Sequence, residues 1–218
     1  MLARAAAMLD QGFFARDVRE LAIDLLGREL RRGEVALRIT EVEAYAGPED
    51  SASHARFGCT PRNTPMWGPP GHAYVYVCYG IHAMLNIVGR SEGEAGAILI
   101  RSCEPVDGLD VVRARRGGKD GPVLLTGPGK VGAALAIDTS FSGHALFEEG
   151  GLTLHEGEPP RDILAGARVG IEYASPADRE APLRFAIAGS PWVTKRSALA
   201  PLSGPRTGPA APRRSARG

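Results

Sequence analysis

Hydrophobic and polar residues alternate along residues 29–45, which is typical of β-strands because successive side chains of a strand point to opposite faces. Two strands, Glu29–Arg32 and Glu34–Tyr45, are predicted to form a hairpin that turns at Gly33. If strict alternation holds, one face of the second strand carries Val35, Leu37, Ile39, Glu41, Glu43 and Tyr45. A core-facing row would then end in two carboxylates and a phenol.

The same pattern predicts further short elements along the rest of the chain. The other expected strands are Tyr74–Tyr79, His82–Val88, Ala97–Cys103, Leu152–His155, Ala167–Tyr173 and Leu183–Ala188. The expected helices are Val18–Leu26, a short turn from Asp50 to His54, Leu109–Arg115 and Pro128–Ala136. Most strands follow one another through turns rather than through crossover helices. This order favours the α+β class, with one mainly antiparallel, curved sheet and a protruding β-hairpin at residues 74–88.

The composition supports one domain with a separate C-terminal segment. At 44% hydrophobic residues the chain can bury a sizeable core, and 28 glycines with 17 prolines favour many turns over a helix bundle. Six of the 26 basic residues, and no acid, lie in 195–218, which leaves 20 basic and 25 acidic residues and a net charge of −5 elsewhere. We therefore expect a catalytic or binding domain at 1–196 and a disordered basic tail at 197–218.

Several classes of protein are disfavoured by the sequence. The three cysteines form no CxxC pair and are odd in number, which argues against a disulfide scaffold or structural zinc and fits a reducing, intracellular compartment such as the bacterial cytoplasm. The histidines share no metal-ligand spacing with them, so no metal and no other cofactor is expected. No apolar run reaches membrane-spanning length, and no membrane partner is expected.

Two charged side chains lie in stretches that are otherwise apolar. Glu43 could act as a general base that activates water, or it could be a salt-bridged structural acid; Glu41 has a similar claim from its spacing. Arg101 ends the run Ile98–Ile100, and a buried arginine usually pairs with a carboxylate. Glu43 is an attractive partner for it.

Aromatic residues and one amide cluster near these charges. Tyr45, His54 and Tyr76 could form a slot for a planar ligand, although ordinary packing explains any one of them alone. Asn86 lies in an apolar run and must find hydrogen-bond partners, either as a structural hub or as a specificity element. Tyr79 and Ile81 lie at the expected hairpin tip, where they could wedge between DNA bases or fold back onto the body.

The segments Glu41–Asp50, Thr60–Asn63, Tyr74–Gly80, Leu85–Ile87 and Leu99–Arg101, followed by Gly127–Lys130 and Gly189–Val193, resemble the 3-methyladenine (alkyladenine) DNA glycosylase family in order and composition. The resemblance covers roughly residues 10–194. It implies a monofunctional enzyme, acting as a monomer, that flips damaged purines such as 3-methyladenine, 7-methylguanine, hypoxanthine and ethenoadenine out of double-stranded DNA and hydrolyses the N-glycosidic bond, leaving an abasic site.

The resemblance also implies roles for individual residues. Glu43 would activate the attacking water, with Arg101 holding both. Tyr45, His54 and Tyr76 would sandwich the base, and Asn86 would exclude the amino group of guanine. Tyr79 would refill the vacated stack, with Ile81 beside it. Thr60, Arg62 and Lys130 are the candidate phosphate contacts.

Two interpretations from other classes stay open at the level of the sequence. One is a non-catalytic protein that binds duplex DNA and bends it with the Tyr79 hairpin. The other is a hydrolase of free purine nucleosides that has the aromatic slot without a working wedge. Release of base from duplex DNA, or from free nucleoside, discriminates between them.

Overall fold

Strand β2 (Val35–Tyr45) is the element to which most of the sheet is joined. The computed structural model describes residues 6–202. The N-terminal part of β2 pairs with β1 (Glu29–Arg32), its whole length pairs with β5 (Ala97–Asp107), and Glu41–Glu43 pair with β8 (Arg184–Ile187). Both faces of β2 are buried nearly throughout.

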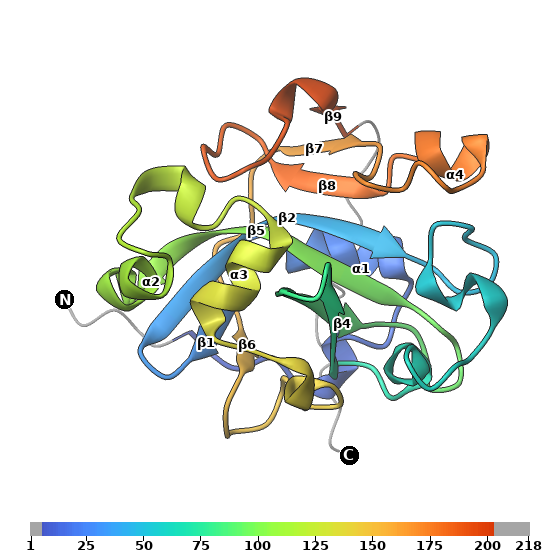
Figure 1. Cartoon of the computed structure of the whole chain (residues 1–218), viewed down its shortest axis with the longest axis horizontal. Helices are drawn as coiled ribbons and strands as arrows, with labels where there is room; N and C mark the ends of the chain where they lie inside the picture. The colour runs from blue at the N-terminus through green and yellow to red at the C-terminus, as the bar shows by residue number, and fades with distance from the viewer. Residues whose placement is uncertain (1–5, 203–218) are drawn as a thin grey trace, which may run out of the picture.

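The described residues form a nine-stranded sheet in which every pairing is antiparallel. Its main path runs β3-β4-β5-β2-β8-β7-β9, and β1 pairs with both β2 and β6. The remaining strands are β3 (Ala73–Cys78), β4 (His82–Val88), β6 (Thr153–His155), β7 (Ile163–Gly166) and β9 (Ala200–Pro201). The sheet curves through the centre of Figure 1 with the helices placed around it. The expected α+β class and curved antiparallel sheet are confirmed.

The helices are short. The α-helices are α1 (Val18–Leu25), α2 (Leu109–Arg115), α3 (Pro128–Leu135) and α4 (Pro176–Glu180). The 3-10 helices are η1 (Gln11–Phe13), η2 (His54–Phe57), η3 (Thr64–Trp67), η4 (Gly121–Leu124), η5 (Thr139–Phe141) and η6 (Arg196–Ala198). Asp17 caps α1 by accepting a hydrogen bond from the Arg19 N–H, and Gly27 follows the helix with a φ of 87°.

Helix α3 lies directly against β4 because glycines leave room for the strand. A Cβ added to Gly132 would lie 2.2 Å from the Ala83 carbonyl oxygen, and one added to Gly129 would lie 2.8 Å from the His82 ring. Figure 1 shows α3 beside the β3–β4 hairpin. The sequence Gly127–Gly132 is therefore explained first by close packing of a helix on a hairpin.

A bulge corrects the alternation expected along β2. Val35, Leu37 and Ile39 belong to the main hydrophobic core, but after the bulge the core residues are Val42 and Ala44. Besides one between Ala36 and Leu37, register shifts lie between Ile39 and Glu41 and between Glu41 and Val42. One extra residue in a strand reverses which side chains face the core. The continuous face from Val35 to Tyr45 was therefore wrong, and Glu43 lies on the opposite face from Leu37.

Two further expectations need correction. The segment 167–173 is not a strand: β7 ends at Gly166, and Gly170 has a φ of 79° that an extended strand does not allow. The tail does not begin at residue 197, because η6 includes Ser197 and Ala198 and β9 pairs with β7. The rest of the expected tail, 203–218, lies outside the described residues.

The Asp50–His54 turn also differs from expectation. The 3-10 helix starts at His54 and is capped by Ser53, while the Asp50 carboxylate accepts hydrogen bonds from the Ala46 and Ala52 N–H groups. The β3–β4 hairpin forms as expected, with an exposed tip; that it protrudes stays a prediction. Over residues 6–202, helices of the length and apolarity needed to cross a membrane are absent.

Candidate active site

A row of directly paired residues crosses four strands and positions the site. Tyr74 on β3 pairs with Asn86 on β4, Asn86 pairs with Leu99 on β5, and Leu99 pairs with Glu43 on β2. Directly paired residues in a sheet share one face. Tyr76 and Arg101 lie two residues further along their strands and therefore face the same side.

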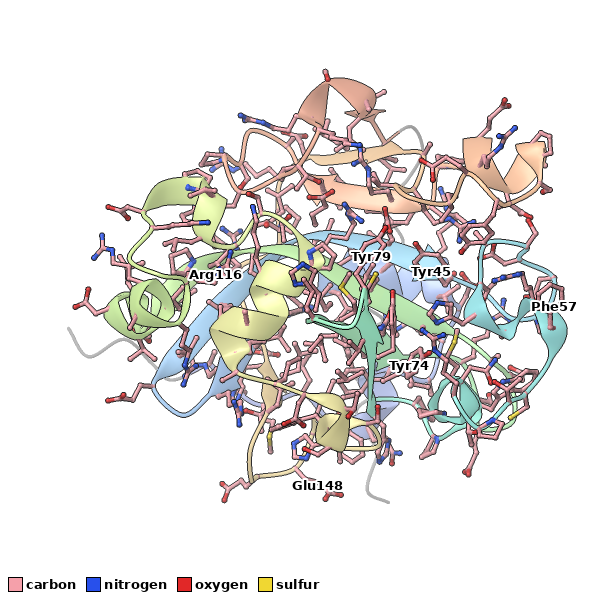
Figure 2. The ribbon with its side chains drawn as sticks, in the orientation of Figure 1. Tyr45, Phe57, Tyr74, Tyr79, Arg116 and Glu148 are labelled. Carbon is pink, nitrogen blue, oxygen red and sulfur yellow. The ribbon has the colours of Figure 1, made fainter. Side chains whose placement is uncertain are left out.

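A cavity of about 390 Å³ lies over this face. Its walls come from the sheet, the η2–η3 region, the hairpin tip and the loop 167–173. The lining residues are Tyr45, Ala52, His54, Arg62, Met66, Tyr74, Tyr76, Val77, Cys78, Tyr79, Met84, Asn86, Ala97, Leu99, Arg101, Pro128, Val169, Gly170, Ile171 and Tyr173. In Figure 2 the side chains of Tyr45, Tyr74 and Tyr79 lie around β4 near the centre of the view. The volume falls within the range of small-molecule sites.

Glu43 is completely buried just behind the wall of the cavity. Its Oε1 accepts from the Val169 N–H at 2.8 Å and lies 3.3 Å from Arg101 Nη1, and its Oε2 accepts from the Tyr45 hydroxyl at 2.8 Å. A carboxylate offers about four acceptor positions. The two hydrogen bonds and the ion pair leave an acceptor position on Oε2 unused, and both Tyr45 and Arg101 line the cavity.

The pKa of Glu43 is raised above its ordinary value of 4.5, first because burial disfavours the charged form. Arg101, the Val169 N–H and the Tyr45 hydroxyl each act in the opposite direction, and the nearby Glu41 adds to the rise. Burial alone would lower the pKa of Arg101, but the carboxylates of Glu43 and Glu41 outweigh it and raise that pKa. Arg101 therefore stays a cation beside Glu43.

Glu41 is saturated with donors and does not face the cavity. It accepts hydrogen bonds from Arg101 Nε, the Ser102 hydroxyl, and both the N–H and the hydroxyl of Thr194, and Arg184 Nη1 lies 3.5 Å away. The Arg101 guanidinium is thus held between two carboxylates. Glu41 fixes the position of Arg101, and its lone pairs are already used.

The aromatic residues form two different walls. The rings of His54 and Tyr76 contact each other edge to face, with centroids 4.6 Å apart, so they form one wall together. Tyr45 belongs to another part of the lining, and the guanidinium of Arg168 lies 4.7 Å from the centroid of its ring. Burial, and then the Glu43 carboxylate, raise the pKa of Tyr45 well above its ordinary value. Its phenol therefore stays protonated and donates to Glu43.

His54 is held as a neutral ring. Its Nδ1 lies 2.9 Å from the Tyr74 hydroxyl, and the side chain of Asn63 donates to the His54 carbonyl oxygen at 2.8 Å. Burial lowers the pKa of His54, and the cations Arg62 and Arg56 lower it further. At neutral pH its imidazole is uncharged, which suits a stacking wall better than an acid or a base.

Asn86 is 3% exposed and lines the cavity. Its Nδ2 donates to the backbone carbonyls of Tyr74, at 3.1 Å, and of Met84, at 3.3 Å. Both amide hydrogens are thereby used, which fixes the orientation of the side chain. Asn86 is therefore a hydrogen-bond hub whose side chain lies in the cavity wall, and its role as a specificity element stays a prediction.

The hairpin tip carries large exposed side chains next to the cavity. Tyr79 is 88% exposed and Ile81 is 76% exposed. Tyr79 also has a φ of 52°, a strained region for a residue with a bulky side chain, and Gly80 follows with 73°. The alternative in which the tip folds back onto the body is therefore wrong.

The three candidate phosphate contacts do not lie together. Arg62 lines the main cavity and, with Thr60, a smaller one of about 160 Å³. Lys130, in the first turn of α3, lines a third cavity with Ile81 and His82. Burial lowers the pKa of Lys130, and the neighbouring cations Arg116 and Lys119 lower it further. Positive charge thus lies on both sides of the main cavity.

Sequence reasoning missed the loop 167–173 as part of the site. Its Val169 N–H binds Glu43, and Arg168, which is 5% exposed, pairs with both oxygens of Asp50 and donates to the Ala44 carbonyl. A signal was present: Arg168 follows the apolar run 163–167, just as Arg101 follows its own. Tyr74 was assigned only to a strand, although its hydroxyl bonds His54.

Among residues 6–202, no group of three His, Cys, Asp or Glu side chains is placed to hold a metal ion. The three cysteines are all free thiols.

Comparison with known proteins gives a consistent result over the same region. Residues 12–191 match the sequence profile of the methylpurine-DNA glycosylase (MPG) family. An Arabidopsis thaliana protein named DNA-3-methyladenine glycosylase is 54% identical over 193 residues, which cover 87% of this chain and 76% of that protein. A Nitrosococcus oceani protein, whose name gives the same activity provisionally, is 58% identical over 194 residues, which cover 89% and 96% of the two chains.

Proposed function

The chain belongs to the methylpurine-DNA glycosylase family, and on that premise we propose that its cavity receives a damaged purine flipped out of duplex DNA. The enzyme is a DNA-3-methyladenine glycosylase, a hydrolase of N-glycosyl bonds that acts on DNA. The observation that carries the proposal is the buried Glu43–Arg101 pair behind an aromatic-walled cavity.

Glu43 is the general base. A water molecule placed at the remaining acceptor position of Oε2 would give up a proton to Glu43 as it attacks C1′ of the deoxyribose. Arg101 stabilises the ionised form of Glu43 and orients the water. Two hydrogen bonds and the ion pair with Arg101 leave the carboxylate little freedom, so the base is in position before substrate arrives.

The flipped base stacks between Tyr45 and the wall formed by His54 and Tyr76. A planar base gains about 1–3 kcal/mol from stacking on an aromatic side chain. Asn86 provides selectivity: its fixed amide would collide with the 2-amino group of guanine, and it cannot turn away because both hydrogens are bonded to backbone carbonyls. Damaged adenines and hypoxanthine lack that group and fit. 7-Methylguanine carries the group, so its release would depend on how readily its cationic base leaves rather than on fit beside Asn86.

The hairpin tip supports a duplex substrate rather than a free nucleoside. Tyr79 and Ile81 are exposed beside the cavity, where a wedge is needed to fill the gap left by the flipped nucleotide. Arg62 with Thr60 on one side and Lys130 on the other would contact backbone phosphates. The partner is therefore double-stranded DNA, bound by one copy of the chain.

The test is release of base from matched substrates. Oligonucleotide duplexes carrying 3-methyladenine, hypoxanthine or ethenoadenine should lose the damaged base and retain an abasic site, and the corresponding free nucleosides should not be cleaved. Cleavage of the free nucleosides at the same rate would support a nucleoside hydrolase instead. Duplex binding without any release of base would support a protein that only bends DNA.

A further inference from the structure

Phe57 is an exposed aromatic ring outside the damaged-base cavity, with no role in the function proposed so far. It ends η2, is 83% exposed, and does not line the main cavity. Single exposed apolar residues are ordinary on protein surfaces. The surroundings of this one are not ordinary, because a guanidinium group that also contacts a second aromatic ring lies against it.

The side chain of Arg56 lies between two aromatic rings. Its guanidinium carbon is 4.7 Å from the centroid of Phe57 and 4.9 Å from the centroid of Tyr173. Arg56 Nη1 donates to the Ser53 carbonyl at 3.0 Å, and the Tyr173 hydroxyl donates to the Ala52 carbonyl at 2.8 Å. The three side chains form a layered stack in which hydrogen bonds hold Arg56 and Tyr173 and the guanidinium covers one face of Phe57, so less rotational freedom is left to lose on binding.

The charge around this stack favours a polyanion. Phe57 borders the small cavity of about 160 Å³, whose other lining residues are His54, Arg56, Thr60, Arg62 and Asn63, with no carboxylate among them. Within the described part of the chain, Arg62 makes no ion pair, and its charge reaches His54 strongly enough to lower that pKa. Two guanidinium groups beside an open aromatic face suit a nucleotide: cations for the phosphate and a ring for the base.

The stack is continuous with the damaged-base cavity. Arg62 and His54 line both cavities, and Tyr173 lines the main one while contacting Arg56. In Figure 2 Tyr45 lies between Tyr79 and Phe57, which is at the edge of the molecule. DNA that places one nucleotide in the main cavity would pass over Arg62 and reach Phe57 on the side away from the Tyr79 hairpin.

We propose that Phe57 is a second stacking contact, which binds a nucleobase of the DNA outside the damaged-base cavity while Arg56 and Arg62 contact the adjoining phosphates. The inference rests on the proposed function, since it takes the duplex to be the substrate. It predicts that the protein touches DNA bases on both sides of the flipped nucleotide: through Tyr79 on one side and through Phe57 on the other.

The test uses the full chain and duplexes with one hypoxanthine and one 2-aminopurine, the fluorescent base being placed at each neighbouring position in turn. Binding of the wild-type protein should change the 2-aminopurine fluorescence at one position, and the same change should persist when Tyr79→Ala binds. Phe57→Leu removes the ring but keeps an apolar side chain; it should abolish that change and weaken Kd by at least about fivefold, as loss of one stacked base does. Phe57→Trp keeps an aromatic ring at this position and should retain both the fluorescence change and the wild-type Kd.

Two controls keep the result interpretable. Val123→Ala removes an exposed apolar residue elsewhere and should change neither quantity. Arg56→Gln leaves Phe57 in place but removes the stacked cation, and it should weaken the signal without abolishing it. If Phe57→Leu binds DNA with wild-type Kd and wild-type fluorescence at every position, the inference is wrong and Phe57 serves another kind of partner. If the wild-type protein releases no base from the same duplexes, the proposed function fails instead.

Discussion

The pKa of the Glu43 carboxylate is set by a balance of two opposing effects. Burial disfavours its charged form, while Arg101 and the hydrogen bonds from Val169 and Tyr45 favour it. Burial has the larger effect, so the pKa lies above the ordinary 4.5 of a glutamate. A general base works best when its pKa approaches the pH at which it operates. Excision should therefore decline on the acidic side at a pH above 4.5, as Glu43 takes up a proton.

Tyr45→Phe should move this acidic limb to higher pH. The variant keeps the aromatic ring but removes the hydroxyl that donates to Glu43 Oε2. That hydrogen bond lowers the pKa of Glu43, so its loss raises the pKa and the base becomes protonated at a higher pH. The measurement is single-turnover release of hypoxanthine across pH. The matched control is Tyr76→Phe, whose hydroxyl does not bond Glu43 and which should leave the midpoint in place. An unmoved midpoint in Tyr45→Phe would mean that another group titrates.

Asn86→Ser should relax the discrimination against guanine. Serine is shorter, so the 2-amino group gains room, and purines that carry this group should be released faster relative to hypoxanthine. Loss of the hydrogen bonds to Tyr74 and Met84 should also lower the free energy of unfolding by about 1–2 kcal/mol. Competition between the two substrates in one reaction gives the ratio directly. A folded variant with the wild-type ratio would place the selectivity elsewhere.

Individual site residues could be predicted where a polar side chain interrupted an apolar run. Arg101 and Asn86 were found in this way; the structure places both in the cavity wall, and Arg101 lies beside Glu43. The same signal marks Arg168, but its segment was assigned to a strand. The sequence could not show which of Glu41 and Glu43 keeps a free acceptor position. That difference depends on Thr194, which is distant in the sequence and donates two hydrogen bonds to the Glu41 carboxylate.

At the scale of elements, helix α3 packs against strand β4 of the β3–β4 hairpin. The glycines of that helix allow it to lie against Ala83 and His82, so the hairpin tip has a rigid support although its own side chains are exposed. A DNA-inserting wedge needs both exposed side chains and a supported backbone, since ordering a mobile tip on insertion would cost conformational entropy.

Tyr79→Ala should weaken flipping and leave the bond-breaking groups intact. The wedge stabilises the extruded state by filling the stack, so without it fewer complexes hold the base in the cavity. Ethenoadenine in duplex DNA is itself fluorescent and reports the flipped fraction, which should fall. The tyrosine is 88% exposed, so the free energy of unfolding should change little. Loss of stability with normal flipping would identify Tyr79 as a packing residue.

Sequence periodicity predicted most of the strands, but it missed β7 and β9 and also failed where the backbone departs from regular geometry. The hairpins β1–β2 and β3–β4 have nearly the expected bounds. The bulge in β2 was missed because strict alternation was continued past Ile39, although the apolar positions shift there to Val42 and Ala44. The loop 167–173 was missed because Gly170 was interpreted as an ordinary glycine within a strand. Both irregularities lie at the site: one turns Glu43 toward the cavity and the other supplies the Val169 N–H.

At the scale of the whole molecule, the basic residues are distributed unevenly between the body and the C-terminal segment of the sequence. Residues 203–218 contain Arg206, Arg213, Arg214 and Arg217 and no acid, whereas the rest of the chain carries an excess of acidic residues. We expect this segment to add affinity through phosphates without contributing to the chemistry. Since β9 completes the sheet beside β7, a truncation must begin at residue 203 and not at 197.

Removal of residues 203–218 should weaken duplex binding mainly at low salt. For every phosphate that the protein no longer neutralises, the slope of log Kd against log salt should fall by at most about 0.9. Single-turnover excision at saturating enzyme should be unchanged. A full-length control in which the four arginines are replaced by serine separates the effect of charge from that of chain length and should match the truncation. If excision at saturation collapsed in either variant, the segment would be part of the fold or of the site.

The most direct test of the account is Glu43→Gln, measured for binding, flipping and excision on one duplex containing ethenoadenine. Glutamine keeps the shape of the side chain but cannot accept a proton from water, and loss of a general base typically slows a reaction about 100- to 10,000-fold. The aromatic walls and the hairpin tip are untouched. We predict a variant that binds the duplex, shows wild-type flipping by fluorescence, and releases the base at a rate reduced by that factor. Excision by Glu43→Gln at the wild-type rate, with flipping intact, would contradict the assignment of Glu43 as the base.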